Sequence, residues 1–490
     1  MLKSQFFRHL FSIREVISSC RHASTIFALS TGLNERGTAI AVVRISGPET
    51  FKGLSKLTKV SPQSEKNPRK AILADIKCPS TDELIDRGIV LWFPKPNSYT
   101  GEDSAELHVH GSRAVVAALL RALSRLEDFR SAEEGEFTKR AFINRKMTLT
   151  QVEALASLIS SQTESQRRFA LDAIDGHVDK LYKNWTDRLL RIIAHVEAII
   201  NFGDEQGLDS DEIVHTKREL LQLYQEIQKH LENGSRRSEM IKDGINITIA
   251  GPPNVGKSTL MNRICQRDLS IVSPVSGTTR DVIEGLLDIN GWKIRVSDTA
   301  GFKDFSDTDD VVEIEGIKRA LERVKKSHLI IYVIDGAEAL KKIKSDSFDC
   351  EVPQMLRENC SNSSDWFFVV NKVDLISRKD TDELLKIFPE TQFISCYSGQ
   401  NVDGLLQLIQ ERIETLHEEC EFDHFINERH LNHLEASFIS LKSAIESFDA
   451  DLSIASHFLL LSCNEIARIT GKIDIESILN IVFQDFCIGK

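Results

Sequence analysis

The chain has 490 residues, a formal net charge of −12 and 41% hydrophobic residues. This length exceeds one hydrophobic core and predicts about three domains, and the apolar content excludes wholesale disorder. The acidic balance excludes the broad basic surface used in non-specific nucleic-acid binding, and no apolar run approaches the ~18 residues of a membrane-spanning helix. The nine cysteines include no CxxC pair, so we expect reduced thiols rather than a disulfide scaffold.

Residues 1–23 differ in composition from the rest of the chain. Four basic residues stand against one acid, Glu15, and the apolar residues from Phe6 to Ile17 are spaced along one helical face. This composition is typical of a mitochondrial transit peptide, and the alternative is a disordered basic N-terminus. Without this segment the remaining chain carries a charge of −15, so we expect any RNA contact to use a local patch or another protein.

Residues 24–145 predict a mixed, β-rich domain. Short β-branched or aromatic runs such as AIAVVRISG and AELHVHG are bounded by glycine or proline, and SRAVVAALLRAL predicts a helix. Little in this segment dictates chemistry by itself.

Two later segments show helical periodicity. Apolar residues follow three- and four-residue steps from Trp185 to Ile200, and again from Leu220 to Leu231, where the sequence ENG predicts the end of the helix. A third stripe runs from Leu431 to Phe448. Each apolar face needs a partner, so we expect one helical domain whose halves flank an inserted domain.

The inserted segment, residues 239–418, alternates strand and helix. INITIA, KIRVSDTAG, LIIYVID, WFFVVNKVD and TQFIS predict near-continuous apolar strands, each followed by a loop and a helical stretch. That pattern is typical of a mostly parallel sheet covered on both faces, so the fold class is multidomain α/β.

GPPNVGKST, residues 251–259, fits the phosphate-binding pattern G-x-x-x-x-G-K-[ST] between a predicted strand and a predicted helix. The glycines let backbone N–H groups turn toward phosphates, and the helix N-terminus adds its positive dipole end. Lys257 is placed to reach the β- and γ-phosphates, and the Ser258 hydroxyl to bind Mg²⁺.

Two further motifs predict guanine specificity. NKVD ends the strand WFFVV, and its Asp374 carboxylate can accept hydrogen bonds from guanine N1–H and N2–H, whereas adenine would leave that charge unpaired. ISCYSG occupies the position of the last guanine loop, where Ser395 and the Cys396 N–H would contact the base.

The remaining motifs predict the γ-phosphate switches. DTAG follows another strand, so Asp298 is expected to hold Mg²⁺ through water and the Gly301 N–H to meet the γ-phosphate. SGTTRD lies where a first switch belongs, with Thr279 as a Mg²⁺ ligand. Phe302 cannot polarise the attacking water as a Ras-like glutamine does.

Two features could replace that glutamine and an arginine finger. A monovalent cation held by Asn254 and the loop Ser273–Thr278 would stabilise charge on the bridging β–γ oxygens. Glu313 or Glu315 in VVEIEGIKRA could orient the water, but spacing alone is equally consistent with an exposed helix face.

The chain ends in FCIGK, with Cys487 at the spacing of a prenylation box. Such boxes rarely end in lysine, and no polybasic stretch or second lipid site precedes Cys487. We therefore expect no membrane anchor, which leaves either a thiol placed for a reaction or a plain helix tail.

GPPNVGKST, SGTTRD, DTAGF, NKVD and FCIGK together resemble the MnmE (TrmE) family of tRNA-modification GTPases. The resemblance extends to PNSYTGEDSAELHVHG and EGEFTKRAFINRKMTLTQVEA and covers residues 25–490. With the transit-like start, the chain is similar to the mitochondrial member of this family.

The resemblance implies how the chain is divided. The implied segments are a transit peptide at 1–23, an α+β tetrahydrofolate-binding and dimerisation domain at 24–145, a helical domain at 146–238 and 419–490, and an inserted Ras-like G domain at 239–418.

The resemblance also implies an activity. A homodimeric, K⁺-stimulated GTPase would work in the mitochondrial matrix with an FAD-containing MnmG/GidA-like partner, as a heterotetramer. Together they would install an aminomethyl-type group at C5 of the wobble uridine, position 34, of mitochondrial tRNA, using 5-formyl- or methylene-tetrahydrofolate. The alternative is a GTPase switch in mitochondrial ribosome assembly or signalling, but such proteins lack the folate-like N-terminal domain.

The resemblance finally implies residue roles. The matched catalytic positions are Glu313, Thr278 and Cys487, since VEIEGI aligns on the family's V-E-x-x-G-I and favours Glu313 over Glu315. The matched K⁺ positions are Asn254, Ser273, Val275 and Thr278, the Mg²⁺ positions are Ser258 and Thr279, and the folate positions are Arg44, Glu106, Lys146 and Lys490. The matched GTP-binding positions are Gly251, Asn254, Val255, Gly256, Lys257, Ser258, Thr259, Thr278, Thr279, Asp298, Thr299, Ala300, Gly301, Asn371, Lys372, Asp374, Ser395 and Cys396.

Three places depart from the family pattern. Thr148 stands where an aspartate is usual in the implied folate site. Phe302 and Lys303 replace Leu-Arg after DTAG, and Cys396-Tyr397 replace Ala-Lys or Ala-Arg in the last guanine loop, where backbone groups make most contacts.

Overall fold

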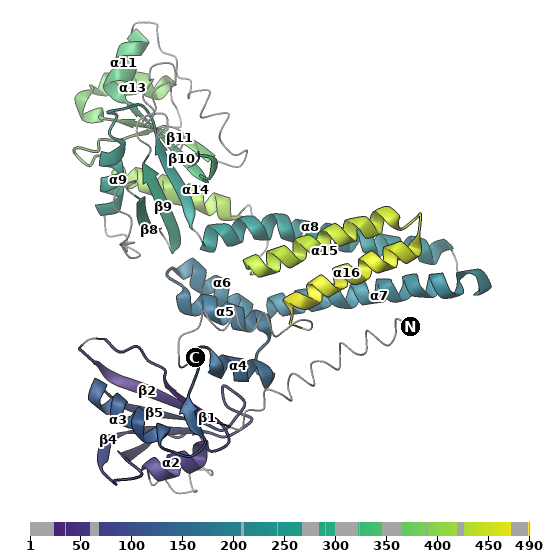
Figure 1. Ribbon diagram of the computed structural model, residues 1–490. Helices are drawn as coiled ribbons and strands as arrows, with labels where there is room; N and C mark the ends of the chain where they lie inside the picture. Colours follow the sequence, from purple (N-terminus) through teal and green to yellow (C-terminus); the bar gives the residue numbers. More distant parts are fainter. Residues whose placement is uncertain are drawn as a thin grey trace, which may run out of the picture. The chain divides into compact units, whose positions relative to one another are not determined.

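The computed structural model describes residues 24–34, 36–58, 68–206, 210–242, 244–266, 284–289, 291–298, 322, 324–344, 365–387, 391–418, 426–471 and 489. The chain divides into two compact units (Figure 1). The first contains residues 1–159, 173–227 and 428–490, and the second contains residues 160–172 and 228–427.

The N-terminal part of the first unit is a six-stranded sheet in the order β3-β4-β5-β2-β1-β6. Its neighbouring strands pair antiparallel, except that β1 and β6 are parallel. The strands are β1 (Thr25–Leu29), β2 (Thr38–Ser46), β3 (Ile72–Lys77), β4 (Leu84–Phe93), β5 (Ser104–Gly111) and β6 (Phe129–Ser131). The helices are α2 (Thr50–Thr58), α3 (Arg113–Ser124) and α4 (Glu136–Ile143).

Helix α3 confirms the prediction made from SRAVVAALLRAL. Ser112 caps its N-terminus, where the side chain accepts from the Val115 N–H. Val116, Leu119 and Leu123 are buried on one face, which is the periodicity expected of a helix lying on a sheet. Alternating buried residues of β2 belong to the same core, so these elements form one α+β layer pair.

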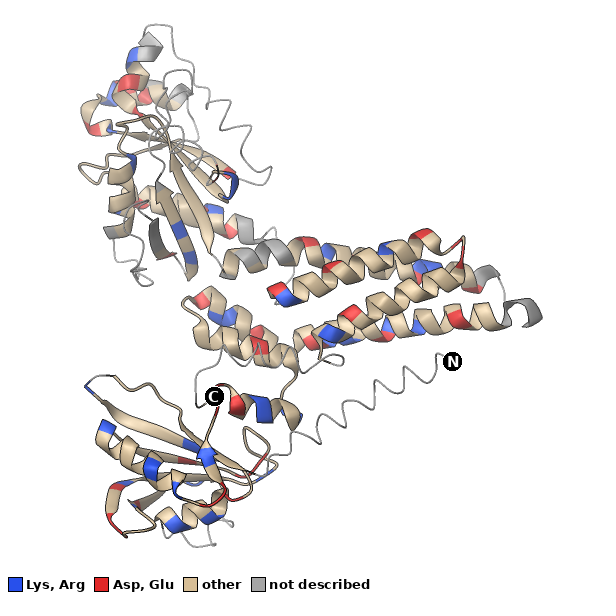
Figure 2. Cartoon of the chain, in the orientation of Figure 1, with Lys and Arg blue, Asp and Glu red and all other residues tan. Residues whose placement is uncertain are grey.

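The rest of the first unit is helical. It contains α5 (Leu149–Ser160), α7 (His177–Gln206), α15 (Glu428–Ser447), α16 (Leu452–Ile469) and the first part of α8 (Ser210–Lys242), while α6 (Glu164–Ile174) belongs mostly to the second unit. The stripe that begins at Trp185 is buried through Ile199, whereas Ile200 is exposed. The rings of Tyr224 on α8 and Phe438 on α15 stack with centroids 4.6 Å apart, so helices from both sides of the insertion pack together. Figure 2 shows acidic and basic residues interspersed along α7, α8, α15 and α16.

The prediction that ENG ends a helix was wrong, because α8 continues to Lys242. Gly234 is buried, and a Cβ at this position would lie 2.0 Å from Ile426 Cδ1. The glycine therefore permits close approach of the segment that contains Ile426, and it does not stop the helix.

A buried ion pair joins α5 to α15 and α16. Glu153 accepts from Arg429 Nε at 2.6 Å and Nη2 at 3.0 Å, and its Oε2 lies 2.8 Å from His430 Nε2. Arg429 also donates to the carbonyls of Arg468 and Ile469 at the end of α16. Burial raises the pKa of Glu153, but His430 and Arg429 outweigh burial and lower it to about 2. Burial lowers the pKa of His430, although the Glu153 carboxylate acts in the opposite direction.

The second unit contains a sheet in the order β12-β11-β10-β7-β9-β8. Its strands are β7 (Ile245–Ala250), β8 (Glu284–Ile289), β9 (Trp292–Asp298), β10 (Leu329–Asp335), β11 (Asp365–Asn371) and β12 (Gln392–Phe393). Its helices are α9 (Lys257–Gln266), α11 (Gly336–Lys344), η3 (Val373–Leu375), α13 (Arg378–Ile387) and α14 (Val402–Glu418). The five predicted strands are confirmed and run parallel, while the unpredicted β8 pairs antiparallel with β9.

Across the described ranges, no helix combines the length and apolar character needed to cross a bilayer.

Candidate functional site

The phosphate-binding pattern lies between β7 and α9, as its sequence predicts. Gly251 has φ +145°, and a Cβ there would lie 2.2 Å from the Val333 carbonyl oxygen, so only glycine fits the turn. Lys257 begins α9 and is buried. Its Nζ donates to the carbonyl oxygens of Gly251 at 3.0 Å and Pro252 at 2.7 Å. The loop therefore folds around the ammonium group, whose charge is placed for an anion.

Two residues of NKVD fasten β11 to this loop. The Asn371 side chain is buried; its Nδ2 donates to Val255 O at 2.8 Å, and its Oδ1 accepts from Cys396 N at 3.0 Å. Lys372 Nζ donates to Asn254 O at 2.8 Å and lies 2.6 Å from Asp335 Oδ2. Asn371 thus links the phosphate loop (residues 251–256) to the base loop (residues 394–399), and Lys372 adds a second link to the phosphate loop.

The base loop follows β12. Ser395 Oγ donates to Asp374 Oδ1 at 2.5 Å and accepts from the Ser398 N–H at 3.1 Å. This hydrogen bond orients a carboxylate on an exposed residue. Burial raises the pKa of the Cys396 thiol to about 11, so the thiol stays protonated at neutral pH. Tyr397 is 86% exposed.

The carboxyl ends of parallel strands thus bring together an anion loop and a polar loop suited to a purine base, which is where open α/β sheets bind nucleotides. Several predicted residues lie outside the described ranges, namely Ser273, Val275, Thr278, Thr279, Thr299, Ala300, Gly301, Glu313, Cys487 and Lys490. Asp298 ends β9, but its side chain is also outside what is described. The Lys372–Asp335 pair was missed, since neither spacing nor composition signals it.

The first unit brings two of the predicted folate residues together. Arg44 on β2 and Glu106 on β5 are cross-strand partners, and Arg44 Nε and Nη2 donate to Glu106 Oε1 at 3.1 and 3.0 Å. The Arg44 guanidinium lies 5.2 Å from the centroid of the Tyr99 ring and 5.8 Å from that of Phe137. Stacking and the ion pair hold this planar cation in one orientation.

The other described folate candidate, Lys146, lies near the start of the helical segment. Lys146 Nζ donates to the Pro96 carbonyl at 3.0 Å. Thr148, which departs from the family pattern, donates its hydroxyl to Asp179 Oδ2. The structure therefore places an aspartate carboxylate beside Thr148 from a different helix, which sequence reasoning missed.

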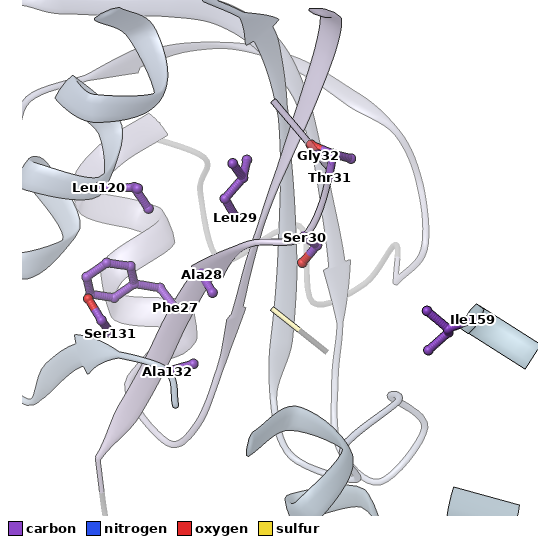
Figure 3. A pocket seen from close by; sticks show the side chains of 10 residues that line it. All are labelled: Phe27, Ala28, Leu29, Ser30, Thr31, Gly32, Leu120, Ser131, Ala132 and Ile159. Atoms are coloured by element: carbon purple, nitrogen blue, oxygen red, sulfur yellow. The ribbon is translucent and has the colours of Figure 1, made fainter. Parts of the chain in front are cut away.

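A cavity of about 650 Å³ lies beside β1 (Figure 3). Its lining is mostly apolar, with side chains that include Phe27, Leu120 and Ile159. At the end of β1, Ser30 Oγ donates to the carbonyl of Gly489 at 3.0 Å. The glycine of the terminal CIGK motif therefore lies against this part of the N-terminal domain.

Comparison with known proteins identifies the family. Residues 149–487 match the family model of the MnmE helical domain, and residues 25–146 match that of the GTP-binding protein TrmE N-terminus. A mitochondrial 5-taurinomethyluridine-tRNA synthase subunit from Danio rerio is 40% identical over 485 residues, which cover 95% of this chain and 93% of the relative. The tRNA modification GTPase MnmE of Parvibaculum lavamentivorans is 40% identical over 469 residues, covering 95% of this chain and 100% of the relative.

A solved structure of Era with MgGDPNP and a 16S ribosomal RNA fragment is 28% identical and covers 34% of this chain and 56% of that chain. Its TM-score of 0.26 is too low to support a conclusion. Because one family model matches more than half of the chain and the relatives span nearly all of it, this chain belongs to the MnmE (TrmE) family of tRNA modification GTPases.

Proposed function

We propose that this chain is the K⁺-stimulated GTPase component of an enzyme that converts C5 of the wobble uridine, position 34, of mitochondrial tRNAs to an aminomethyl-type derivative. One observation carries the proposal: Asn371 fastens the phosphate loop to the base loop within a chain whose N-terminal residues match the TrmE N-terminus. The relatives' names support the tRNA substrate and the mitochondrial location, which we propose to be the matrix.

In this proposal, residues 251–259 cradle the phosphates of GTP and Lys257 neutralises them. Ser258 and Thr279 would hold Mg²⁺, and Asp298 would reach it through water. The Ser258 hydroxyl is the kind of hard oxygen ligand that Mg²⁺ prefers, and it stands in the first turn of α9, where the helix dipole also favours phosphate. Asp374, held by Ser395, would accept from the guanine N1–H and N2–H groups.

Asn254 is the described residue of the proposed K⁺ site. It is exposed at φ +63°, and Lys372 holds its carbonyl, which fixes the backbone that presents the amide. Oxygens of Ser273, Val275 and Thr278 would complete the site. When bound, K⁺ would supply the charge that an arginine finger supplies elsewhere. Glu313 would orient the attacking water, in place of the Ras-like glutamine.

The N-terminal domain would bind 5-formyl- or methylene-tetrahydrofolate through Arg44, Glu106, Lys146 and Lys490. Arg44 and Glu106 present a donor and an acceptor side by side, each about one-fifth exposed, which suits a flat polar ring. We further propose a homodimer that assembles with an FAD-containing MnmG/GidA-like protein into a heterotetramer. The FAD would reside on that partner.

The cation role is tested by GTP turnover in KCl and in NaCl at equal ionic strength. We expect much faster turnover in KCl, and Asn254→Ala should remove the difference. Asn254→Gly is the matched variant, because glycine keeps the left-handed backbone while removing the amide. Equal rates in both salts for the unmodified protein would refute the K⁺ role.

The tRNA role is tested by mass spectrometry of mitochondrial tRNA nucleosides from cells that lack this protein. We expect loss of the wobble-uridine derivative, and an unchanged nucleoside profile would overturn the assignment. Complementation with Cys487→Ser should restore GTP hydrolysis but not modification, because we assign the thiol to the modification reaction.

A further inference from the structure

Arg263 belongs to none of the nucleotide motifs, yet it contacts the base loop directly. It lies on α9, the helix that follows the phosphate loop. Its Nε donates to the Cys396 carbonyl at 2.9 Å and its Nη2 to the Tyr397 carbonyl at 2.8 Å. Two donors of one rigid plane on successive carbonyls fix the orientation of both peptides, not only their distance.

The Cys396 residue is held at both of its backbone groups. Its N–H donates to Asn371 Oδ1 at 3.0 Å, and its carbonyl accepts from Arg263. In a planar trans peptide the C=O and the following N–H point in opposite directions. Since Arg263 draws the Cys396 carbonyl toward α9, it turns the Tyr397 N–H away from α9.

We propose that Arg263 is a positioning residue for guanine recognition, acting through the backbone N–H groups of Cys396 and Tyr397. This inference rests on the proposed GTP site. A fixed N–H donates to the O6 of guanine and opposes the 6-amino group of adenine, which is itself a donor. Asp374 reads the N1 and N2 side of the ring. Arg263 therefore governs the O6 side, and it does so without touching the nucleotide.

Hydrogen bonds inside the loop, such as that from the Ser398 N–H to Ser395 Oγ, supply part of its order, and Arg263 supplies the rest. Tyr397 is 86% exposed, so its backbone competes with water for hydrogen bonds. Without the guanidinium, the carbonyls of Cys396 and Tyr397 lose these two hydrogen bonds, so the loop samples more conformations. Affinity then falls because binding must order the loop.

The test uses three diphosphates that separate the two sides of the base. GDP has O6, the N1–H and the 2-amino group; inosine diphosphate keeps O6 and the N1–H; 2-aminopurine riboside diphosphate keeps the 2-amino group alone. We expect Arg263→Ala to lower the affinity for GDP and for inosine diphosphate by about 10-fold each. The affinity for 2-aminopurine riboside diphosphate should fall by less than ~2-fold. Arg263→Lys offers no planar pair of donors, so its affinity for GDP should lie between those of the unmodified chain and Arg263→Ala. In turnover, KM for GTP should rise while kcat stays unchanged.

If Arg263→Ala lowers the affinity for all three nucleotides equally, or for none of them, the proposal is overturned. The melting temperature of the nucleotide-free variant should match that of the unmodified chain; a lower value with equal losses indicates a purely structural role. Asp374→Asn provides the separate check on the GTP site, since it should weaken GDP strongly. If the unmodified chain does not prefer GDP to ADP, the proposed site itself fails, whatever Arg263 does.

Discussion

Replacing Glu153 with glutamine should destabilise the helical part of the first unit. The carboxylate accepts two hydrogen bonds from Arg429 and one from His430, and only 8% of its side chain is exposed. Glutamine has one acceptor oxygen and presents an NH₂ group to donors, so Arg429 would keep a partly buried charge without a counterion. Breaking one partner of a buried ion pair costs ~3–5 kcal/mol.

The pKa of Glu153 gives an independent magnitude. The interval from its ordinary value of 4.5 to about 2 corresponds to roughly 3 kcal/mol of stabilisation at neutral pH. A loss on the order of 3 kcal/mol should lower the melting temperature of this unit by about 5–10 °C.

The assay is thermal unfolding of the full chain with and without GDP, so that the transition of the nucleotide-binding unit can be assigned by its shift. Glu226→Gln is the matched control in the same unit, because Glu226 pairs with Arg188 at 2.6 Å but is 49% exposed. Surface pairs contribute ~0–1 kcal/mol, so the control should melt close to the unmodified chain. If both variants melt alike, burial does not set the strength of the Glu153 pair, and the reasoning is wrong.

Three further predictions concern acid stability and two glycines. Because the pKa of Glu153 is lowered in the folded state, its contribution to stability is complete above pH 4.5 and is lost as the pH falls toward about 2. The difference in unfolding free energy between the unmodified chain and Glu153→Gln should therefore shrink across this pH window. Denaturant unfolding at a series of pH values measures it. Gly256→Ala should lower the affinity for GDP by at least about 10-fold in a fluorescence titration. Gly256 has φ +97°, and an added Cβ would lie 2.4 Å from Asn371 Nδ2. An unchanged affinity would contradict the role of Asn371. Gly489→Ala, whose Cβ would lie 2.3 Å from Leu29 O, should reduce tRNA modification by at least ~10-fold and leave GTP hydrolysis intact, and loss of both activities would count against this division of roles.

The local fold of the candidate nucleotide site could be predicted because it depends on short contiguous motifs. A strand, a glycine turn, a lysine and a helix start follow one another in GPPNVGKST, and local sequence determines all of them. The strands around the motif were also predictable, since parallel strands buried on both faces are apolar throughout. The family resemblance added an identity that composition and periodicity do not contain.

The contacts that hold the site could not be predicted, because they join residues far apart in the chain. Arg263 and Cys396 are separated by 133 positions, and no local pattern marks the arginine. Glu153 and Arg429 are separated by 276 positions, and in the sequence each is one charge among many. The ENG error has a related cause, since the reason for Gly234 is the close approach of Ile426 in space.

The contact between Ser30 and Gly489 has a consequence for how the protein is made. These residues are 459 positions apart, so during synthesis β1 leaves the ribosome long before its partner exists. Domains generally fold as they emerge, N-terminal first, so the N-terminal sheet must be stable while this seam is still open. The entropic cost of closing this loop grows only slowly with the number of residues in it. The time before residue 489 is synthesised therefore matters more for folding than the length of the loop. A folding assay on chains that stop before residue 489 should therefore show a folded N-terminal sheet that lacks the Ser30–Gly489 hydrogen bond.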